Sequence, residues 1–368
     1  MRSVFVLILV LSFILTFCGR STAMTGVISP DVKFSPDGEW LAYSGETVTL
    51  KNLKTGETIQ LPKHQMGEVY NGLDFSPNGR ILASAFDNMD DRICFWDVQN
   101  KSFLSPNVFA GSGTTTVAFS PNDHFIAGVD GWGSIFIYDL EKVNPHPLDP
   151  GFPRPGLNGT GMINQILSQG KPNGLAFSLG GDILALGTDT VKLYDTANWQ
   201  LVKSLSSNPN TIWPCHGGLD FSPDGEILAS LSDKEAGLII LLWDWRKGEV
   251  VNELKSTLSD VTAIRFSPGG KYIACGSSAE IPPQSFNIEI LDINSGKSVL
   301  KLGEPSMGGM VCGIDFSPDV KFIAWIISSG SAFIKDISSD ITDPRSFRAV
   351  SPHSKLMTIW GGIKSKYK

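Results

Sequence analysis

The residue types that most often carry catalysis or bind metals are few in this sequence, and they lie far apart. The five histidines are His64, His124, His146, His216 and His353. Neither they nor the cysteines form an HExxH or CxxC motif or a paired-carboxylate arrangement, and no Gly-x-Ser-x-Gly nucleophile motif occurs. Glycine-rich stretches such as residues 111–113 lack a following helix and lysine, so they are interpreted as turns rather than phosphate-binding loops. The sequence therefore predicts no catalytic residue, no metal site and no cofactor.

One repeated pattern organises the chain instead. A segment of the form Phe-Ser-Pro-Asp-Gly is followed two residues later by an apolar pair that ends in alanine, and its copies are 41 to 58 residues apart. The copies begin at Phe34, Phe75, Phe119, Phe177, Phe221, Phe266 and Phe316. This order of residues favours a type I turn, because proline presets its own φ and glycine eases the exit. The prolines predicted to shape these turns are Pro36, Pro77, Pro121, Pro223, Pro268 and Pro318.

Each turn lies between two apolar segments, for example residues 72–75 and 81–85, so it predicts a β-hairpin. A third segment then ends in an aromatic or apolar residue followed by an acid, as in Trp96-Asp97 and Trp243-Asp244. A second turn leads to an outer strand. The pattern predicts four antiparallel strands in each repeat.

Four strands in a repeat that ends in Trp-Asp resemble the WD-repeat β-propeller family, and the resemblance covers nearly all of residues 25–350. It implies an all-β, seven-bladed β-propeller of four-stranded antiparallel sheets. It also implies that Asp130, Asp189 and Asp233 are structural residues that satisfy turn amides. The family's Gly-His pair is missing from every repeat, so its buried histidine network is not expected. The first repeat also resembles the TolB-type periplasmic propellers.

The repeats place the propeller at residues 24–350. Within it, residues 346–350 are predicted to form the outer strand of blade seven. Residues 351–368 are predicted to be a trailing strand and a basic tail. Residues 24–29 provide barely one strand, so we expect the ring to close by packing between blades seven and one, because an unpaired sheet edge is a liability.

Residues 1–23 have the features of a cleaved export signal. Arg2 precedes an apolar run at residues 4–17 that is short for a membrane span, and residues 21–23 are small, as a signal peptidase requires. An uncleaved anchor and lipidation of Cys18 remain as alternatives, although Phe17 departs from the lipidation pattern. The sequence predicts an exported protein, periplasmic or secreted, that is attached to a membrane only under one of these alternatives.

The net charge argues against one class of partner, nucleic acids, and the positions of the cysteines bear on whether the chain forms disulfide bonds. The formal net charge is −7, and removal of residues 1–23 leaves 28 basic against 37 acidic residues, or −9. A chain this acidic repels phosphate backbones, so no nucleic-acid partner is expected. The four remaining cysteines lie in or beside apolar runs, which favours core packing over disulfide bonds. They are Cys94, Cys215, Cys275 and Cys312.

Aromatic residues in long connections are the candidate partner-binding residues: Trp132, Trp213, His216 and Phe286. The resemblance implies that the second-to-third-strand and blade-to-blade connections share one face of the ring, and these residues are assigned to that face together with the largest insertion, residues 141–172. The alternative for the two tryptophans is that they cover blade edges. Two functions stay open. One is a scaffold that binds a protein or peptide through a loop face, and the other is an enzyme or ligand sensor at the channel mouth. Acids, histidines or arginines that converge on the channel would favour the second function, and an aromatic, proline-rimmed patch the first.

Overall fold

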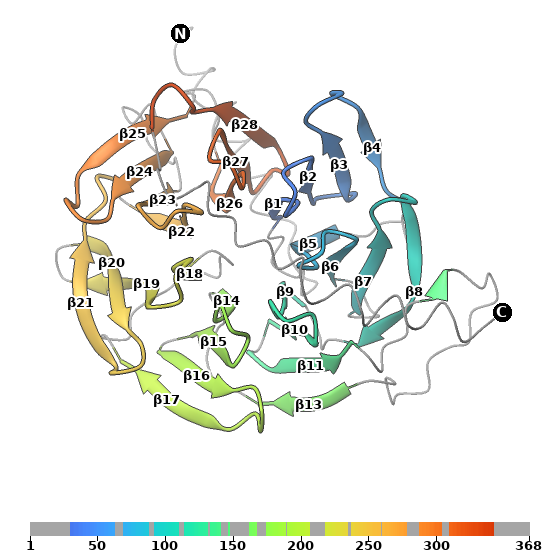
Figure 1. The fold of residues 1–368 in the computed structure, drawn as a ribbon, viewed down its shortest axis with the longest axis horizontal. Helices are drawn as coiled ribbons and strands as arrows, with labels where there is room; N and C mark the ends of the chain where they lie inside the picture. Colours follow the sequence, from blue (N-terminus) through green and yellow to red (C-terminus); the bar gives the residue numbers. More distant parts are fainter. Residues whose placement is uncertain are drawn as a thin grey trace, which may run out of the picture.

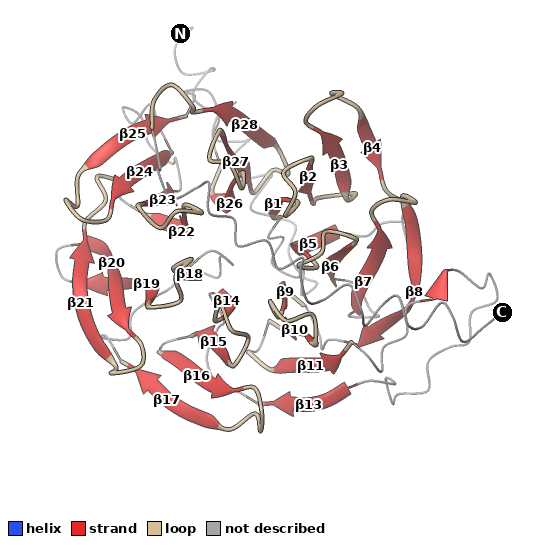
Figure 2. Cartoon of the chain, in the orientation of Figure 1, coloured by secondary structure: helices blue, strands red, loops and turns tan. Residues whose placement is uncertain are grey.

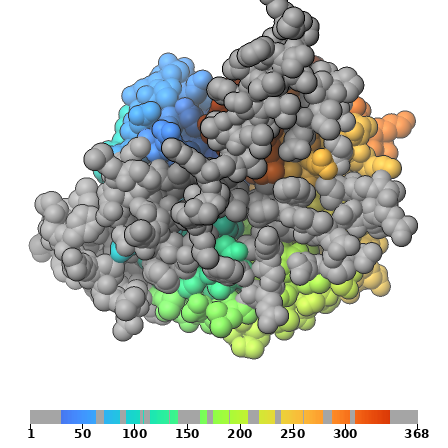
Figure 3. Space-filling view, turned by 180° about the vertical axis from the view of Figure 1, so that it is seen from behind, coloured from blue at the N-terminus to red at the C-terminus, as the bar shows by residue number. Residues whose placement is uncertain are grey.

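A computed structural model describes residues 30–62, 69–87, 92–109, 114–131, 133–140, 146–147, 162–167, 174–188, 190–206, 218–234, 237–258, 260–277, 287–303 and 309–341. The described residues form a ring of seven antiparallel sheets, or blades, each with its first strand at the centre and its last strand at the rim (Figures 1 and 2). From behind, the colours of the described residues run from blue at the upper left, through green along the lower edge, to yellow and orange on the right (Figure 3). No helix among these residues is long and apolar enough to cross a membrane.

Blades 1 to 3 are built from the first thirteen strands. Blade 1 has β1 (Val32–Phe34), β2 (Trp40–Tyr43), β3 (Thr49–Asn52) and β4 (Thr58–Gln60). Blade 2 has β5 (Val69–Phe75), β6 (Ile81–Asp87), β7 (Arg92–Asp97) and β8 (Ser102–Phe109), with β12 (His146–Pro147) added at its rim. Blade 3 has β9 (Thr116–Phe119), β10 (Phe125–Val129), β11 (Ile135–Asp139) and β13 (Met162–Ile166).

Blades 4 to 7 complete the ring. Blade 4 has β14 (Gly174–Phe177), β15 (Ile183–Gly187), β16 (Val191–Asp195) and β17 (Leu201–Leu205). Blade 5 has β18 (Leu219–Phe221), β19 (Ile227–Lys234), β20 (Gly237–Asp244) and β21 (Glu249–Leu254). Blade 6 has β22 (Val261–Phe266), β23 (Tyr272–Ser277), β24 (Ile288–Asp292) and β25 (Ser298–Leu302), and blade 7 has β26 (Val311–Phe316), β27 (Phe322–Ile327) and β28 (Ala332–Asp336).

The turn between the first and second strands is built by its own side chains. In blade 1 the Ser35 hydroxyl donates to the Asp37 carboxylate at 2.6 Å and accepts the Trp40 amide at 2.9 Å. Gly38 takes φ +70°, a left-handed conformation that glycine adopts without strain. Val320 occupies the same place in blade 7 at φ +56°. The six turn prolines named from the sequence all lie in these turns.

In blades 2, 4, 5, 6 and 7 the acid that ends the third strand accepts an amide of the turn that follows it, and Asn52 does the same in blade 1. Asp97 accepts the Asn100 amide at 2.7 Å, and Asp244 accepts the Lys247 amide at 3.0 Å. The preceding Trp96 is fully buried and packs edge to face against Phe103, with ring centroids 5.7 Å apart. The Trp-Asp pair therefore joins a core anchor to a turn cap, which explains why the two residues recur together.

The core is distributed between blades rather than within one centre. Apolar clusters lie at every one of the seven seams, and the seam between blades 7 and 1 has the smallest, with six buried members. Cys94, Cys275 and Cys312 are buried in the apolar clusters, which confirms the core prediction for them. Cys215 lies outside the described residues.

Part of the sequence interpretation of residues 141–172 is wrong. Because β13 is the outer strand of blade 3, the insertion falls between the third and fourth strands, and so leaves blade 3 at the face opposite to the one assigned. Its β12 segment pairs with β8 of the neighbouring blade, His146 against Ser105. The predicted segments 1–23, 346–350 and 351–368 lie outside the described residues and stay predictions.

Candidate functional site: the charged central channel

The four candidate partner-binding residues, Trp132, Trp213, His216 and Phe286, lie outside the described residues, so their assignment stays a prediction. Of the three acids expected to cap turns, Asp130 accepts the Ser134 amide at 2.7 Å. Asp189 and the Asp233 side chain lie outside what the structure describes. The described residues instead bring together a set of charged side chains that sequence reasoning missed.

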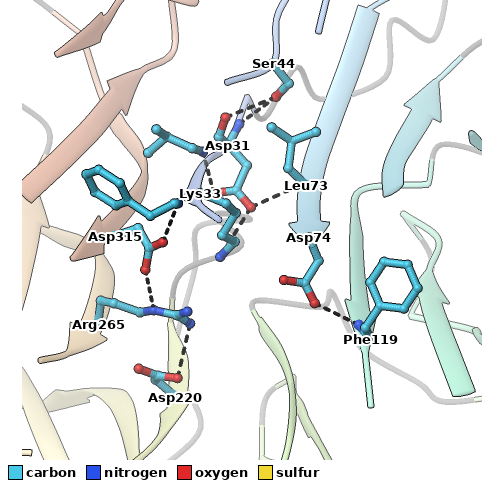
Figure 4. A network of polar contacts seen from close by, with 11 residues as sticks. Asp31, Lys33, Ser44, Leu73, Asp74, Phe119, Asp220, Arg265 and Asp315 are labelled. Carbon is cyan, nitrogen blue, oxygen red and sulfur yellow. Dashed lines mark hydrogen bonds and ion pairs between the residues drawn. The ribbon is translucent and has the colours of Figure 1, made fainter. Parts of the chain in front are cut away.

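These side chains come from the innermost strand of each blade. Because side chains alternate along a strand, the residue before each repeated phenylalanine faces away from that phenylalanine's seam and toward the ring centre. Round the ring these residues are Lys33, Asp74, Ala118, Ala176, Asp220, Arg265 and Asp315. Asp31, two residues before Lys33 on the approach to β1, joins them (Figure 4). One signal in the sequence could have identified these residues, apart from Asp31: each of them directly precedes a repeated phenylalanine.

Three of the carboxylates hold neighbouring blades together. Asp74 accepts the amide of Phe119 in the next blade at 2.7 Å, and Asp220 accepts the amide of Phe266 at 2.8 Å. At the closing seam, Asp315 accepts the Phe34 amide at 2.8 Å. A carboxylate that accepts a backbone amide makes a stronger bond than a neutral acceptor does. The ring therefore closes between blades 7 and 1 through the same contact that joins two of its other seams.

Two cations are distributed unevenly among the acids. The Arg265 guanidinium contacts Asp315 at 2.9 Å and Asp220 at 3.3 Å. The Lys33 ammonium lies 3.6 Å from Asp31, whose carboxylate also accepts the Leu73 amide of blade 2 at 3.2 Å. With Asp74 the set holds four acids against two bases, a charge of −2 when all are ionised.

The channel shifts the pKa values of its groups. Burial raises the pKa of Asp74 from 3.8 to about 6, and the nearby Lys33 charge and the Phe119 amide offset only part of that effect. Burial likewise raises the pKa of Asp220 above its usual value, with Arg265 acting in the opposite direction. For Arg265, burial alone would lower the pKa, but the charges of Asp220 and Asp315 raise it overall.

A cavity of about 270 Å³ lies within this ring. Its lining runs from Asp31 and Gly313 near the start of the first strands to Pro121, Leu179 and Pro223 in the first-to-second-strand turns. The cavity therefore follows the channel toward the face of the ring that carries these turns, which we call the turn face. Within the described residues, no group of three or more histidine, cysteine, aspartate or glutamate side chains is placed to hold a metal ion.

Comparison with known proteins agrees with the repeat architecture. A model of the family described as WD domain, G-beta repeat matches residues 56–97 and 248–279. The first range contains the fourth strand of blade 1 and the first three strands of blade 2, and the second contains the fourth strand of blade 5 and the first two strands of blade 6. The chain is a WD-repeat β-propeller. Members of this family generally act as protein-interaction scaffolds.

Individual relatives are distant from this propeller. It is 27% identical over 183 residues to pre-mRNA-processing factor 19 of Oryza sativa subsp. japonica, covering 47% of this chain and 29% of the relative. It is 25% identical over 195 residues to WD repeat-containing protein SL1-17 of Schistosoma mansoni, covering 52% and 55% of the two chains. The propeller thus spans about half or less of these relatives' lengths.

A solved structure matches the propeller over a larger share of the chain. This match, the crystal structure of the mitotic checkpoint complex, has a TM-score of 0.67 and 16% identity, and covers 85% of this chain and 90% of the other. At that identity the match shows the fold alone.

Proposed function

We propose that this propeller is an exported scaffold that binds a protein or peptide partner through one face. Consecutive antiparallel strands turn at alternate ends. The first-to-second and third-to-fourth connections therefore share one face, and the second-to-third and blade-to-blade connections share the other, which we call the variable face.

The observation that carries the proposal is the contrast between the two faces. On the face opposite to the variable face, every first-to-second-strand turn has five residues, from 35–39 in blade 1 to 317–321 in blade 7. The third-to-fourth-strand connections between described strands have four or five residues, except in blade 3, where the insertion between β11 and β13 has 22. Connections on the variable face differ widely in length, from two residues between β19 and β20 to thirteen between β17 and β18. A rigid scaffold that varies its loops on one face is the usual architecture of a binding surface. By chain order, Trp132, Trp213, His216 and Phe286 all fall in connections of the variable face.

Export rests on the sequence of residues 1–23, and the proposal assigns no catalysis. The test is capture of a partner from the native host by the mature chain. Replacing Trp132 and Trp213 together with alanine should abolish capture and leave the melting curve unchanged. A matched control replaces Leu201 and Val202, which are 51% and 52% exposed on the rim strand β17, and should retain capture. Capture that survives the tryptophan changes would contradict the proposal.

A second candidate, ligand binding at the channel mouth, is favoured by a specific observation. Acids and an arginine converge on the channel, as the alternative function required. Channel-mouth binding and partner capture by the variable face are compatible, because they use different parts of the ring.

A further inference from the structure

The charges around the channel are arranged as an interrupted ring. Through five consecutive blades, from blade 5 to blade 2, the residue before the repeated phenylalanine alternates between acid and base: Asp220, Arg265, Asp315, Lys33 and Asp74. Each base has an acid on either side. Blades 3 and 4 interrupt the series with Ala118 and Ala176, whose short side chains leave room where the other five blades place long or charged ones. The channel therefore has more free space beside blades 3 and 4 than beside the other five blades.

The acids at the two ends of the series are not equivalent. Asp220 is paired with Arg265, whereas Lys33 lies within ion-pair distance of Asp31 rather than of Asp74. Among the described residues, Asp74 has one hydrogen-bond donor, the Phe119 amide, and no cation within 4.0 Å. Figure 4 shows its second oxygen pointing into the channel. Asp74 is therefore a recessed carboxylate with an oxygen free to receive a charge partner.

The cavity suits one kind of group. At about 270 Å³ it falls just below the range of about 300–1,000 Å³ that holds drug-sized ligands, so it accommodates a group the size of a side chain. Ala118, Ala176, Phe119, Phe177 and Leu179 give it an apolar wall beside the carboxylate. The net negative charge of the ring excludes an anion, and the apolar wall favours a cation with a hydrocarbon stem over a bare ion.

We propose that the channel binds an ammonium or guanidinium group on an apolar stem, with Asp74 as its counterion and the gap at Ala118 and Ala176 as its space. The group enters from the turn face, because the cavity lining extends to Pro121, Leu179 and Pro223 in the turns. This site goes beyond the proposed scaffold function, since it uses the channel and the turn face rather than the variable face.

The test uses the mature chain and four small probes of similar size: butylammonium, butylguanidinium, butyrate and butanol. Calorimetric titration at pH 7.5 should give saturable binding of the two cations only. Asp74→Asn should weaken cation binding at least tenfold, because it removes the charge and keeps the shape. Ala176→Leu, which fills the gap without changing charge, should also remove binding. Asp336→Asn, on the exposed end of β28, is the matched control and should bind as the unmodified chain does.

Blocked lysine and arginine tripeptides identify the source of the cation. If they bind at least as tightly as butylammonium and acetyl-lysine does not, the natural ligand is a peptide side chain. If only the free amines bind, the ligand is a small molecule. Equal binding of butyrate, no saturable binding of either cation, or unchanged affinity in a folded Asp74→Asn chain would overturn the proposal. Partner capture by the variable face is measured separately, so either proposal can fail alone.

Discussion

Replacing Asp74 with asparagine should stabilise this propeller at neutral pH. Burial raises the Asp74 pKa from 3.8 to about 6, so ionising this group is harder in the folded state than in the unfolded chain. At 1.36 kcal/mol per pKa unit, the shift corresponds to about 3 kcal/mol of stability lost once the pH exceeds the folded pKa. Asparagine removes the charge and keeps an oxygen that can accept the Phe119 amide. We therefore expect Asp74→Asn to raise the free energy of unfolding by about 3 kcal/mol at pH 7.5.

The pH dependence of this gain separates the explanation from general repacking. An acid with a raised folded pKa is harmless below its unfolded pKa and becomes destabilising as the pH rises toward the folded value. The advantage of Asp74→Asn should therefore shrink to less than about 1 kcal/mol at pH 4. Urea unfolding of both chains at pH 7.5 and pH 4 measures the two differences. A variant that is less stable than the original at pH 7.5, or whose gain is the same at both pH values, would refute the reasoning.

Three further substitutions test other contacts in the ring. Gly313→Ala should cost about 1–3 kcal/mol in urea unfolding, since its Cβ would clash with an Asp31 carboxylate oxygen at the closing seam. Gly45→Ala, whose Cβ would have its nearest neighbour at 3.8 Å, should be nearly neutral. Arg265→Met should destabilise the chain by about 2 kcal/mol, which is less than the roughly 3–5 kcal/mol lost when a fully buried ion pair is broken, because the arginine side chain is 35% exposed. A neutral result would mean that Asp220 and Asp315 need no counterion. Glu289→Gln should cost about 1–3 kcal/mol at pH 7. Burial opposes ionisation of Glu289, but its hydrogen bonds outweigh burial and lower its pKa below 4.5. The cost of the substitution should therefore fade as the pH drops below 4.5 and through the pKa of the folded state. A cost that is as large at pH 3 as at pH 7 would contradict this explanation.

The blades were predictable from the sequence because their information is local. A serine, a proline and a glycine within four residues determine the Ser35 turn, and the acid after Trp96 caps a turn three residues away. Each such unit repeats, so counting the phenylalanines counted the blades. The channel was not predictable in the same way, because its contacts join blades: Arg265 reaches Asp220 and Asp315, which lie 45 and 50 residues away along the chain.

The prediction of which face carries the insertion, residues 141–172, was wrong for a related reason. The sequence of blade 3 shows a strand at residues 135–139 and then a long proline-rich stretch, and nothing local indicates that the outer strand, β13, comes only at Met162–Ile166. Pairing of β13 with β11, with Ile135 opposite Ile166, decides the matter and is a tertiary contact. The interruption of the charged series at blades 3 and 4 was visible in the sequence as Ala118 and Ala176. Only the closed ring shows that these two alanines lie beside each other on one side of the channel.

Cross-linking of the captured partner tests most directly whether binding uses the variable face. Lys255 follows β21 on that face, whereas Lys297 and Lys321 lie in turns on the opposite one, and all three are exposed. A lysine-reactive cross-linker followed by mass spectrometry should join the partner to Lys255 and not to the other two. Links confined to Lys297 and Lys321 would place the partner on the turn face and contradict the scaffold proposal.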